Sequence, residues 1–215
     1  MIKVLVTGFG AYTEAADNPS GVIAARLNDW QGSGVRIHGL LLPATSAGVG
    51  PSLAEAIERV RPDAVLLTGV TPGRAAVTIE RIAINVQDFP IPDNDGAAPI
   101  DVAVVPGGPD AYFSTLPIKA ILAAWRSHLI PSSVSNTAGT YVCNQTFYLA
   151  RHLTEGRGVI AGLVHIPLAS SSAAGVHPPP PSLDLDLLAE AVRIAAVVAA
   201  THRGPDVSLG AGTTG

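Results

Sequence analysis

Cys143 is the only cysteine among 215 residues, and it stands where small polar residues and glycine give way to a helical pattern. The residues after it, NQTFYLARHL, predict a helix that begins at or beside the cysteine. The positive end of a helix dipole favours a thiolate, and the free N–H groups of a first turn can stabilise an oxyanion. A nucleophilic thiol is therefore one hypothesis. The alternative is a small buried hydrophobic side chain, the usual state of a free cysteine.

A thiolate nucleophile needs an acid–base partner, usually histidine, and the chain contains six histidines. His165 follows the apolar run VIAGLV and precedes IP, so we expect it at the carboxyl end of a buried strand. Open α/β sheets place their functional sites at this edge. The other five lie in a mixed strand, near predicted helix ends or in a proline-rich loop: His38, His128, His152, His177 and His202. A hydrogen-bonded, partly buried histidine without a catalytic role is the alternative for His165.

A third group should orient the imidazole of such a pair. Glu80 is a candidate because it is a charged residue inside the otherwise apolar, extended segment TIERIAIN. Charged side chains are rarely buried unless they are paired. If this segment is a strand, the neighbouring Arg81 points to the opposite face. A surface salt bridge is the alternative explanation for both residues.

The elements that would position these residues alternate along the chain. Strands are predicted at 3–10, 35–43, 63–70, 132–138 and 159–169, with a further extended segment at 76–89. Helices are predicted at 18–30, 46–62, 116–130, 143–156 and 183–203. The strands read as continuous apolar runs, which is typical of a mostly parallel sheet that helices cover on both faces.

Three segments lack a helical or strand pattern. They are the turn-rich loop 90–101, the Ser/Ala/Pro-rich segment 170–181, predicted as a surface loop, and the segment 204–215, predicted as a flexible tail. No composition change marks a domain boundary, so we expect a single domain over residues 1–203.

Composition excludes several classes of protein. Hydrophobic residues make up 47% of the chain and charged residues 14%, which favours a packed core over disorder. The net charge is −4 without a dense Lys/Arg run, so nucleic acid is not an expected partner.

A lone cysteine excludes an internal disulfide and a cysteine-rich zinc site. The apolar runs at the start and near the end are too short or too interrupted for a signal peptide or a membrane span. We therefore expect a cytoplasmic protein with a reduced thiol and no membrane partner.

In their order, these segments resemble the pyroglutamyl peptidase I family, also called pyrrolidone carboxyl peptidases, which are cysteine peptidases. The matching motifs extend over nearly the whole chain: VLVTGFG, NPS, ERIAIN, IPDNDG, STLPIKA, SNTAGTYVCNQTFY and HIP. The resemblance implies a three-layer α/β/α sandwich. It also implies a triad with Cys143 as nucleophile, His165 as general base and acid, and Glu80 as the orienting carboxylate.

The implied reaction is removal of an N-terminal pyroglutamyl residue from a peptide through a thioester, with no metal or organic cofactor. The implied partner is a peptide or small amide with a blocked N-terminus, and the chain is expected to form a homodimer or homotetramer. The resemblance also implies a substrate pocket that includes Phe9, Tyr12, Val70, Ile91, Tyr141 and Val142.

Four segments beside the expected pocket depart from the family pattern. GFGAY replaces G-F-x-P-F, and TGVTPGR replaces G-Q-A-G-G-R, so that Val70 stands in place of a glutamine. DFPIPDN replaces D-A-R-I-P-D-N, so that Pro90 stands in place of an arginine, and P-E-Q after HIP is absent. A triad beside an altered pocket also fits two other functions: a cysteine amidase or peptidase for a different small N-acyl cap, and a catalytically silent binding protein. Fast alkylation of Cys143 at neutral pH distinguishes either enzyme from the binding protein.

Overall fold

In the computed structural model, which describes residues 1–11 and 18–212, a seven-stranded sheet forms the middle layer. Its strand order is β2-β3-β1-β4-β9-β5-β8. The strands are β1 (Ile2–Phe9), β2 (Gln31–Gly32), β3 (Val35–Leu42), β4 (Ala64–Val70), β5 (Val77–Glu80), β8 (Ser132–Ser135) and β9 (Ile160–Ile166). Strands β3, β1, β4 and β9 run parallel to one another, and β8 runs parallel to β5. However, β5 is antiparallel to β9, and β2 is antiparallel to β3. The predicted, mostly parallel sheet is confirmed.

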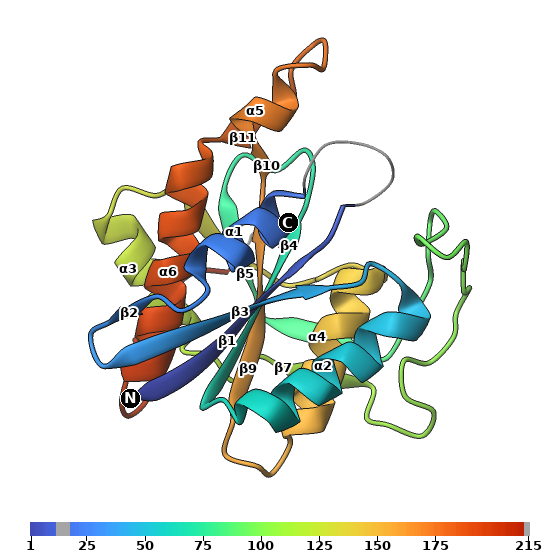
Figure 1. The fold of residues 1–215 in the computed structure, drawn as a ribbon, viewed down its shortest axis with the longest axis horizontal. Coiled ribbons are helices and arrows are strands. Elements are labelled where there is room, and N and C mark those ends of the chain that lie inside the picture. Colours follow the sequence, from blue (N-terminus) through green and yellow to red (C-terminus); the bar gives the residue numbers. More distant parts are fainter. Residues whose placement is uncertain (12–17, 213–215) are drawn as a thin grey trace.

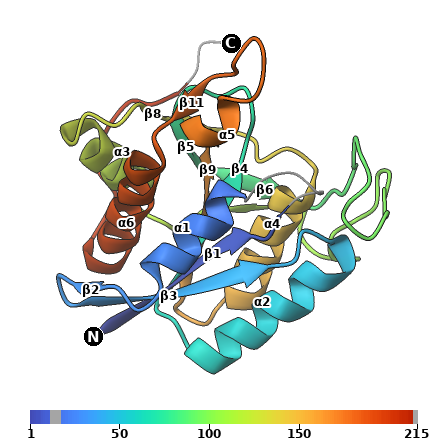
Figure 2. The same ribbon diagram turned by 45° about the horizontal axis from the view of Figure 1, so that its top comes forward.

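Helices cover both faces of this sheet (Figures 1 and 2). One face carries α1 (Pro19–Leu27), α3 (Ile118–Ser127) and α6 (Leu185–Thr201), and the other carries α2 (Ser46–Val60) and α4 (Val142–Thr154). The three-layer arrangement is thus confirmed. Two short pairs lie outside the main sheet: β6 (Ile82–Ile84) with β7 (Ala111–Phe113), and β10 (Leu168–Ala169) with β11 (Ser182–Leu183).

The segment predicted as a surface loop at 170–181 is partly helical. It begins with the short helix α5 (Ser170–Ala173), and β10 and β11 pair on either side of it. The loop prediction is therefore wrong for the first four residues. Their low-complexity composition concealed a helical turn that buries Ala173.

Alternate residues of the central strands enter two different cores, because successive side chains of a strand point to opposite faces. The core under α1, α3 and α6 includes Val4, Val6, Leu66, Ile79 and Val164. The core under α2 and α4 includes Leu5, Phe9, Val65, Leu67 and Leu163. By this alternation Glu80, which follows Ile79, and His165, which follows Val164, both lie on the face that α4 covers.

The helix starts differ in how their free N–H groups are satisfied. Side chains of Asn18, Thr45 and Asp184 cap α1, α2 and α6. In contrast, the N-cap residue of α4, Tyr141, forms no side-chain cap. The first-turn N–H groups of α4 thus receive no capping acceptor from the side chain of this residue.

The chain beyond α6 caps a distant helix. Asp206 accepts hydrogen bonds from the backbone N–H groups of Lys119 and Ala120, each at 2.9 Å. These are the second and third residues of α3, whose own N-cap residue, Pro117, forms no side-chain hydrogen bond. The tail pattern in the sequence does not reveal this remote cap.

Replacing Asp206 by alanine should lower the free energy of unfolding by about 1–2 kcal/mol, because two N–H groups of α3 lose their acceptor. The corresponding fall in the melting midpoint is about 2–8 °C and is measurable by scanning calorimetry. Glu55→Ala is the control, because Glu55 forms an exposed ion pair with Arg59 that contributes at most about 0.5 kcal/mol. An Asp206→Ala protein that melts together with the wild type would contradict a capping role.

Candidate active site

Cys143 is the second residue of α4 and is partly buried. The predicted helix start is therefore confirmed within one residue. The first helical hydrogen bond runs from Gln145 N to the carbonyl of Tyr141, at 3.1 Å. The N–H groups before Gln145 have no partner one turn back in the helix. This geometry places a thiol beside backbone donors at the positive end of the helix dipole.

His165 is the sixth residue of β9, and its side chain is 4% exposed. Thr78 of the antiparallel strand β5 lies opposite it, so that Glu80 is its diagonal neighbour on the same face. The Nδ1 atom of His165 is 2.8 Å from Oε1 of Glu80. Glu80 is fully buried, which excludes the alternative of a surface salt bridge for this residue.

Cys143 and His165 meet over the backbone of Gly69 in β4. A Cβ atom at Gly69 would lie 2.7 Å from Cys143 Sγ and 3.6 Å from His165 Nε2. The thiol and Nε2 of the imidazole therefore share one small space above this glycine. The structure brings together the three side chains that the sequence singled out, in the order Cys143, His165, Glu80.

The electrostatics of this group favour an ion pair. Burial alone lowers the pKa of His165, but hydrogen bonds and charge interactions with Cys143 and Glu80 raise it to about 9. Burial likewise opposes ionisation of Glu80, yet the contacts with His165, Ser135 and Arg74 hold the pKa of its carboxyl below the usual value. A histidine with a raised pKa is suited to hold the proton of a neighbouring thiol, which is the basis of a thiolate–imidazolium pair.

Asn144, which the sequence did not single out, fixes the chain beside Cys143. Its buried side chain accepts a hydrogen bond from Ile84 N at 3.0 Å and donates to the carbonyls of Ile84 and Val86 at 2.9 and 3.0 Å. On the other side of Cys143, the hydroxyl of Thr140 donates to the carbonyl of Asp88. The segment after β5 therefore holds the start of α4 on both sides of the thiol.

An aromatic contact also links the segment after β5 to the start of α4. The rings of Phe89 and Tyr141 meet edge to face with centroids 4.6 Å apart, and the hydroxyl of Tyr141 donates to the carbonyl of Pro92. Phe89 occupies the first of the two positions at which this chain departs from the family pattern D-A-R. Where the resemblance implies a small residue, this chain therefore has a buried ring, and it contacts the residue two positions before Cys143.

The other residues expected in the substrate pocket lie in different surroundings. Phe9 is buried in the core under α2 and α4, whereas Val70 packs against the opposite core. Ile91 is half exposed, and the side chain of Val142 is buried. Tyr12 lies outside the described residues. Their role in substrate binding stays a prediction.

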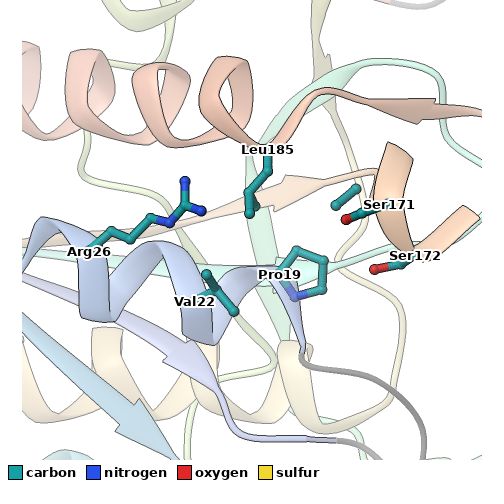
Figure 3. A pocket seen from close by; sticks show the side chains of 7 residues that line it. Pro19, Val22, Arg26, Ser171, Ser172 and Leu185 are labelled. Atoms are coloured by element: carbon teal, nitrogen blue, oxygen red, sulfur yellow. The ribbon is translucent and has the colours of Figure 1, made fainter.

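Two surface cavities lie along α1 and contain none of the three triad side chains. One, of about 300 Å³, lies between α1, α5 and the start of α6 (Figure 3). It is lined by Pro19, Val22, Arg26, Ala169, Ser171, Ser172 and Leu185. The second, of about 500 Å³, extends along α1 to Phe9. The lining of the first cavity offers no nucleophile beside a base.

The described residues contain no cluster of three or more His, Cys, Asp and Glu side chains arranged to hold a metal ion. Within the same part of the chain, no helix is long and apolar enough to cross a membrane.

Replacing Gly69 by alanine should lower kcat/KM by about 100-fold, because the new methyl group must displace Cys143 Sγ. The measurement is turnover together with a melting curve. Gly175→Ala is the matched control, because a Cβ there meets no atom within 4 Å. Full activity of the Gly69→Ala protein would show that the thiol does not react from this position.

Comparisons with known proteins identify the family of this chain. The family model described as "Pyroglutamyl peptidase" matches residues 2–202. A pyrrolidone-carboxylate peptidase of Pseudomonas fluorescens is 44% identical over 210 residues, covering 97% of both chains. One of Vibrio campbellii is 46% identical over 197 residues, covering 89% of this chain and 93% of its own.

Solved structures agree with the fold as well. The pyrrolidone carboxyl peptidase of Thermococcus litoralis superimposes with a TM-score of 0.94 at 32% identity, covering 98% of this chain and 100% of its own. Pyroglutamyl peptidase I of Bacillus amyloliquefaciens gives a TM-score of 0.91 at 36% identity, covering 94% of this chain and 98% of its own. With a family model over nearly its full length and relatives above 40% identity, this chain belongs to the pyroglutamyl peptidase family.

Proposed function

We propose that this protein is a cysteine peptidase that removes an N-terminal pyroglutamyl residue from peptides, with Cys143, His165 and Glu80 as its catalytic triad. Family membership supports the activity. The observation that carries the assignment of residues is the buried 2.8 Å contact between His165 Nδ1 and Glu80 Oε1, next to a thiol at a helix start.

In the first half of the reaction, the sulfur of Cys143 attacks the carbonyl carbon of the pyroglutamyl residue. The thiol proton resides on Nε2 of His165, and the carbonyl oxygen becomes an oxyanion. First-turn N–H groups of α4 are positioned to stabilise that charge. Glu80 accepts the Nδ1–H of His165, which keeps the imidazole in the orientation that presents Nε2 to the sulfur.

The tetrahedral intermediate then breaks its C–N bond. The leaving amine takes the proton from Nε2 of His165, and the pyroglutamyl group remains on Cys143 as a thioester. In the second half, water gives a proton to His165 and attacks the thioester carbonyl. Cleavage of the C–S bond releases pyroglutamic acid, and the proton on His165 again pairs with the thiolate.

The test is release of a fluorescent amine from pyroglutamyl-7-amino-4-methylcoumarin under reducing conditions. Matched amides of proline, alanine and N-acetylalanine are compared at the same concentrations. We expect the pyroglutamyl amide to be cleaved with the highest kcat/KM, and we expect prior treatment with iodoacetamide to stop cleavage. Preferential cleavage of another amide would contradict the pyroglutamyl assignment. The N-terminal group of that amide would then be the group that the altered segments around Val70 and Pro90 recognise.

Three further points are proposals that rest on the sequence. Residues 1–203 form the catalytic domain, and the protein acts in the cytoplasm, where a thiol nucleophile stays reduced. The chain assembles as a homodimer or homotetramer. Sedimentation velocity of the purified protein measures the assembly, and a purely monomeric protein at micromolar concentration would contradict it.

A further inference from the structure

Arg74, in the loop between β4 and β5, reaches the triad from outside it. Its Nη1 atom is 2.8 Å from Oε1 of Glu80, the same oxygen that contacts Nδ1 of His165. Nη1 also donates to the hydroxyl of Thr78, the residue opposite His165 in the sheet. One carboxylate oxygen of Glu80 is therefore held between an imidazole and a guanidinium.

The contact between Arg74 and Glu80 matters because the carboxylate of Glu80 is buried. The Glu80 side chain is fully buried, whereas that of Arg74 is 28% exposed. A buried carboxylate is unfavourable unless a cation pairs with it and hydrogen bonds fix it. The charged groups that face Glu80 are His165 from β9 and Arg74 from the loop. The neighbouring Arg81 instead donates to Asn136.

Charge balance gives Arg74 a role in the reaction. With the thiolate–imidazolium pair formed, Cys143, His165 and Glu80 carry charges of −1, +1 and −1, which leave a net charge of −1. Arg74 adds +1 at hydrogen-bond distance and makes the group neutral. The same balance holds when the negative charge moves from sulfur to the oxyanion, because the total charge is unchanged in that step.

We propose that Arg74 is a positioning residue of the reaction, which fixes the carboxylate of Glu80 against His165 and balances the negative charge of the buried triad. This inference rests on the proposed function for its effect on turnover. Its effect on the thiol of the free protein does not depend on any substrate.

The alternative is that Arg74 only anchors its loop. Loss of a loop anchor lowers stability and weakens substrate binding, but it does not change the pH at which the thiol becomes reactive. Loss of a balancing charge does change it. Without Arg74, the thiolate, imidazolium and carboxylate together have a net charge of −1. Formation of the thiolate is then less favourable, so the sulfur of Cys143 keeps its proton up to a higher pH.

The experiment measures the rate of Cys143 alkylation by iodoacetamide as a function of pH, by intact-protein mass, in wild type, Arg74→Met and Arg74→Lys. Arg59→Met is the matched control, because Arg59 forms an exposed ion pair on α2. For Arg74→Met we expect the pH of half-maximal alkylation to rise by about one unit, the lower end of the effect of a neighbouring charge. The lysine variant should lie between wild type and Arg74→Met, and the Arg59→Met profile should match wild type.

Turnover gives the second readout. Arg74→Met should lower kcat about 10- to 100-fold with little change in KM, because a displaced orienting group affects the chemical step. In a Glu80→Gln background the same substitution should have almost no further effect, because the two residues act as one unit.

Three results would overturn the proposal. The first is a pH profile of alkylation in Arg74→Met that matches wild type, and the second is the same unchanged profile together with a loss of turnover that a lower melting midpoint explains. The third is full additivity of the effects of Arg74→Met and Glu80→Gln on turnover. Failure of the proposed function has a different signature. In that case the wild-type protein would not cleave pyroglutamyl amides, while the alkylation profiles would still differ.

Discussion

Replacing Cys143 by alanine is expected to abolish cleavage of pyroglutamyl amides, with kcat lower by about 10⁴–10⁶-fold. No other thiol exists in the chain to take over the attack. The fold should persist, because the cysteine is only partly buried and alanine suits a helix. Single-turnover kinetics and a melting curve on the same preparation separate loss of chemistry from loss of structure.

Cys143→Ser is the companion variant. Its hydroxyl has the shape of the thiol but is a much weaker nucleophile beside a base matched to a thiol. Turnover by the alanine variant above about 1% of wild type, in a preparation free of contaminating peptidase, would mean that another group makes the covalent bond.

The alanine variant should also change His165. The hydrogen bond to Cys143 is the largest influence that raises the pKa of His165, and burial opposes it. Removing the sulfur therefore lowers the pKa of His165 from about 9, and NMR titration of the imidazole protons would show the shift. An unmoved titration would mean that Glu80 alone sustains the raised pKa.

Cys143 and His165 were predictable because each stands at a junction that sequence patterns mark clearly. A helical pattern begins at the cysteine, and an apolar strand ends at the histidine. Strand periodicity even fixes the face, because His165 follows Val164, which enters the opposite core. What the pattern could not give is the distance between them, since strand order and helix packing depend on contacts far apart in sequence.

Glu80 was predictable as a charged residue in an apolar strand, but its geometry was not. Its contact with His165 depends on β5 lying antiparallel beside β9. A run of apolar strands and helices favours parallel neighbours, and nothing in the local sequence marks this reversal. The diagonal position of Glu80 relative to His165 follows only once that pairing is known.

Gly69, Arg74 and Asn144 illustrate what the sequence shows only in outline. A glycine inside a buried strand suggests a close approach by another group, but not which group approaches. Asn144 lies in the first turn of a helix, where a polar residue is ordinary, so its burial under β6 could not be expected. Arg74 resembles any loop arginine until Glu80 is placed next to it.

Replacing Glu80 by glutamine is expected to lower kcat by about 10⁴-fold while leaving KM nearly unchanged, as when an orienting aspartate becomes asparagine in a serine peptidase triad. The substitution keeps the shape of the side chain but replaces an oxygen with an amide NH₂. That NH₂ can donate to Nδ1 of His165, which favours the tautomer with its proton on Nε2 and removes the base from the sulfur. The arginine that contacts Glu80 also loses its ionic partner.

The measurement is kcat and KM over pH together with iodoacetamide alkylation, and Glu55→Gln on the exposed face of α2 is the matched control. Loss of the negative charge should lower the pKa of His165, so that alkylation at neutral pH slows as well. A Glu80→Gln enzyme that keeps its alkylation rate but loses turnover would place Glu80 after thiol activation, in proton delivery to the leaving amine. A Glu80→Gln enzyme that keeps both its alkylation rate and its turnover would show that Cys143 and His165 are sufficient for the reaction. The buried carboxylate would then be only a structural partner of Arg74.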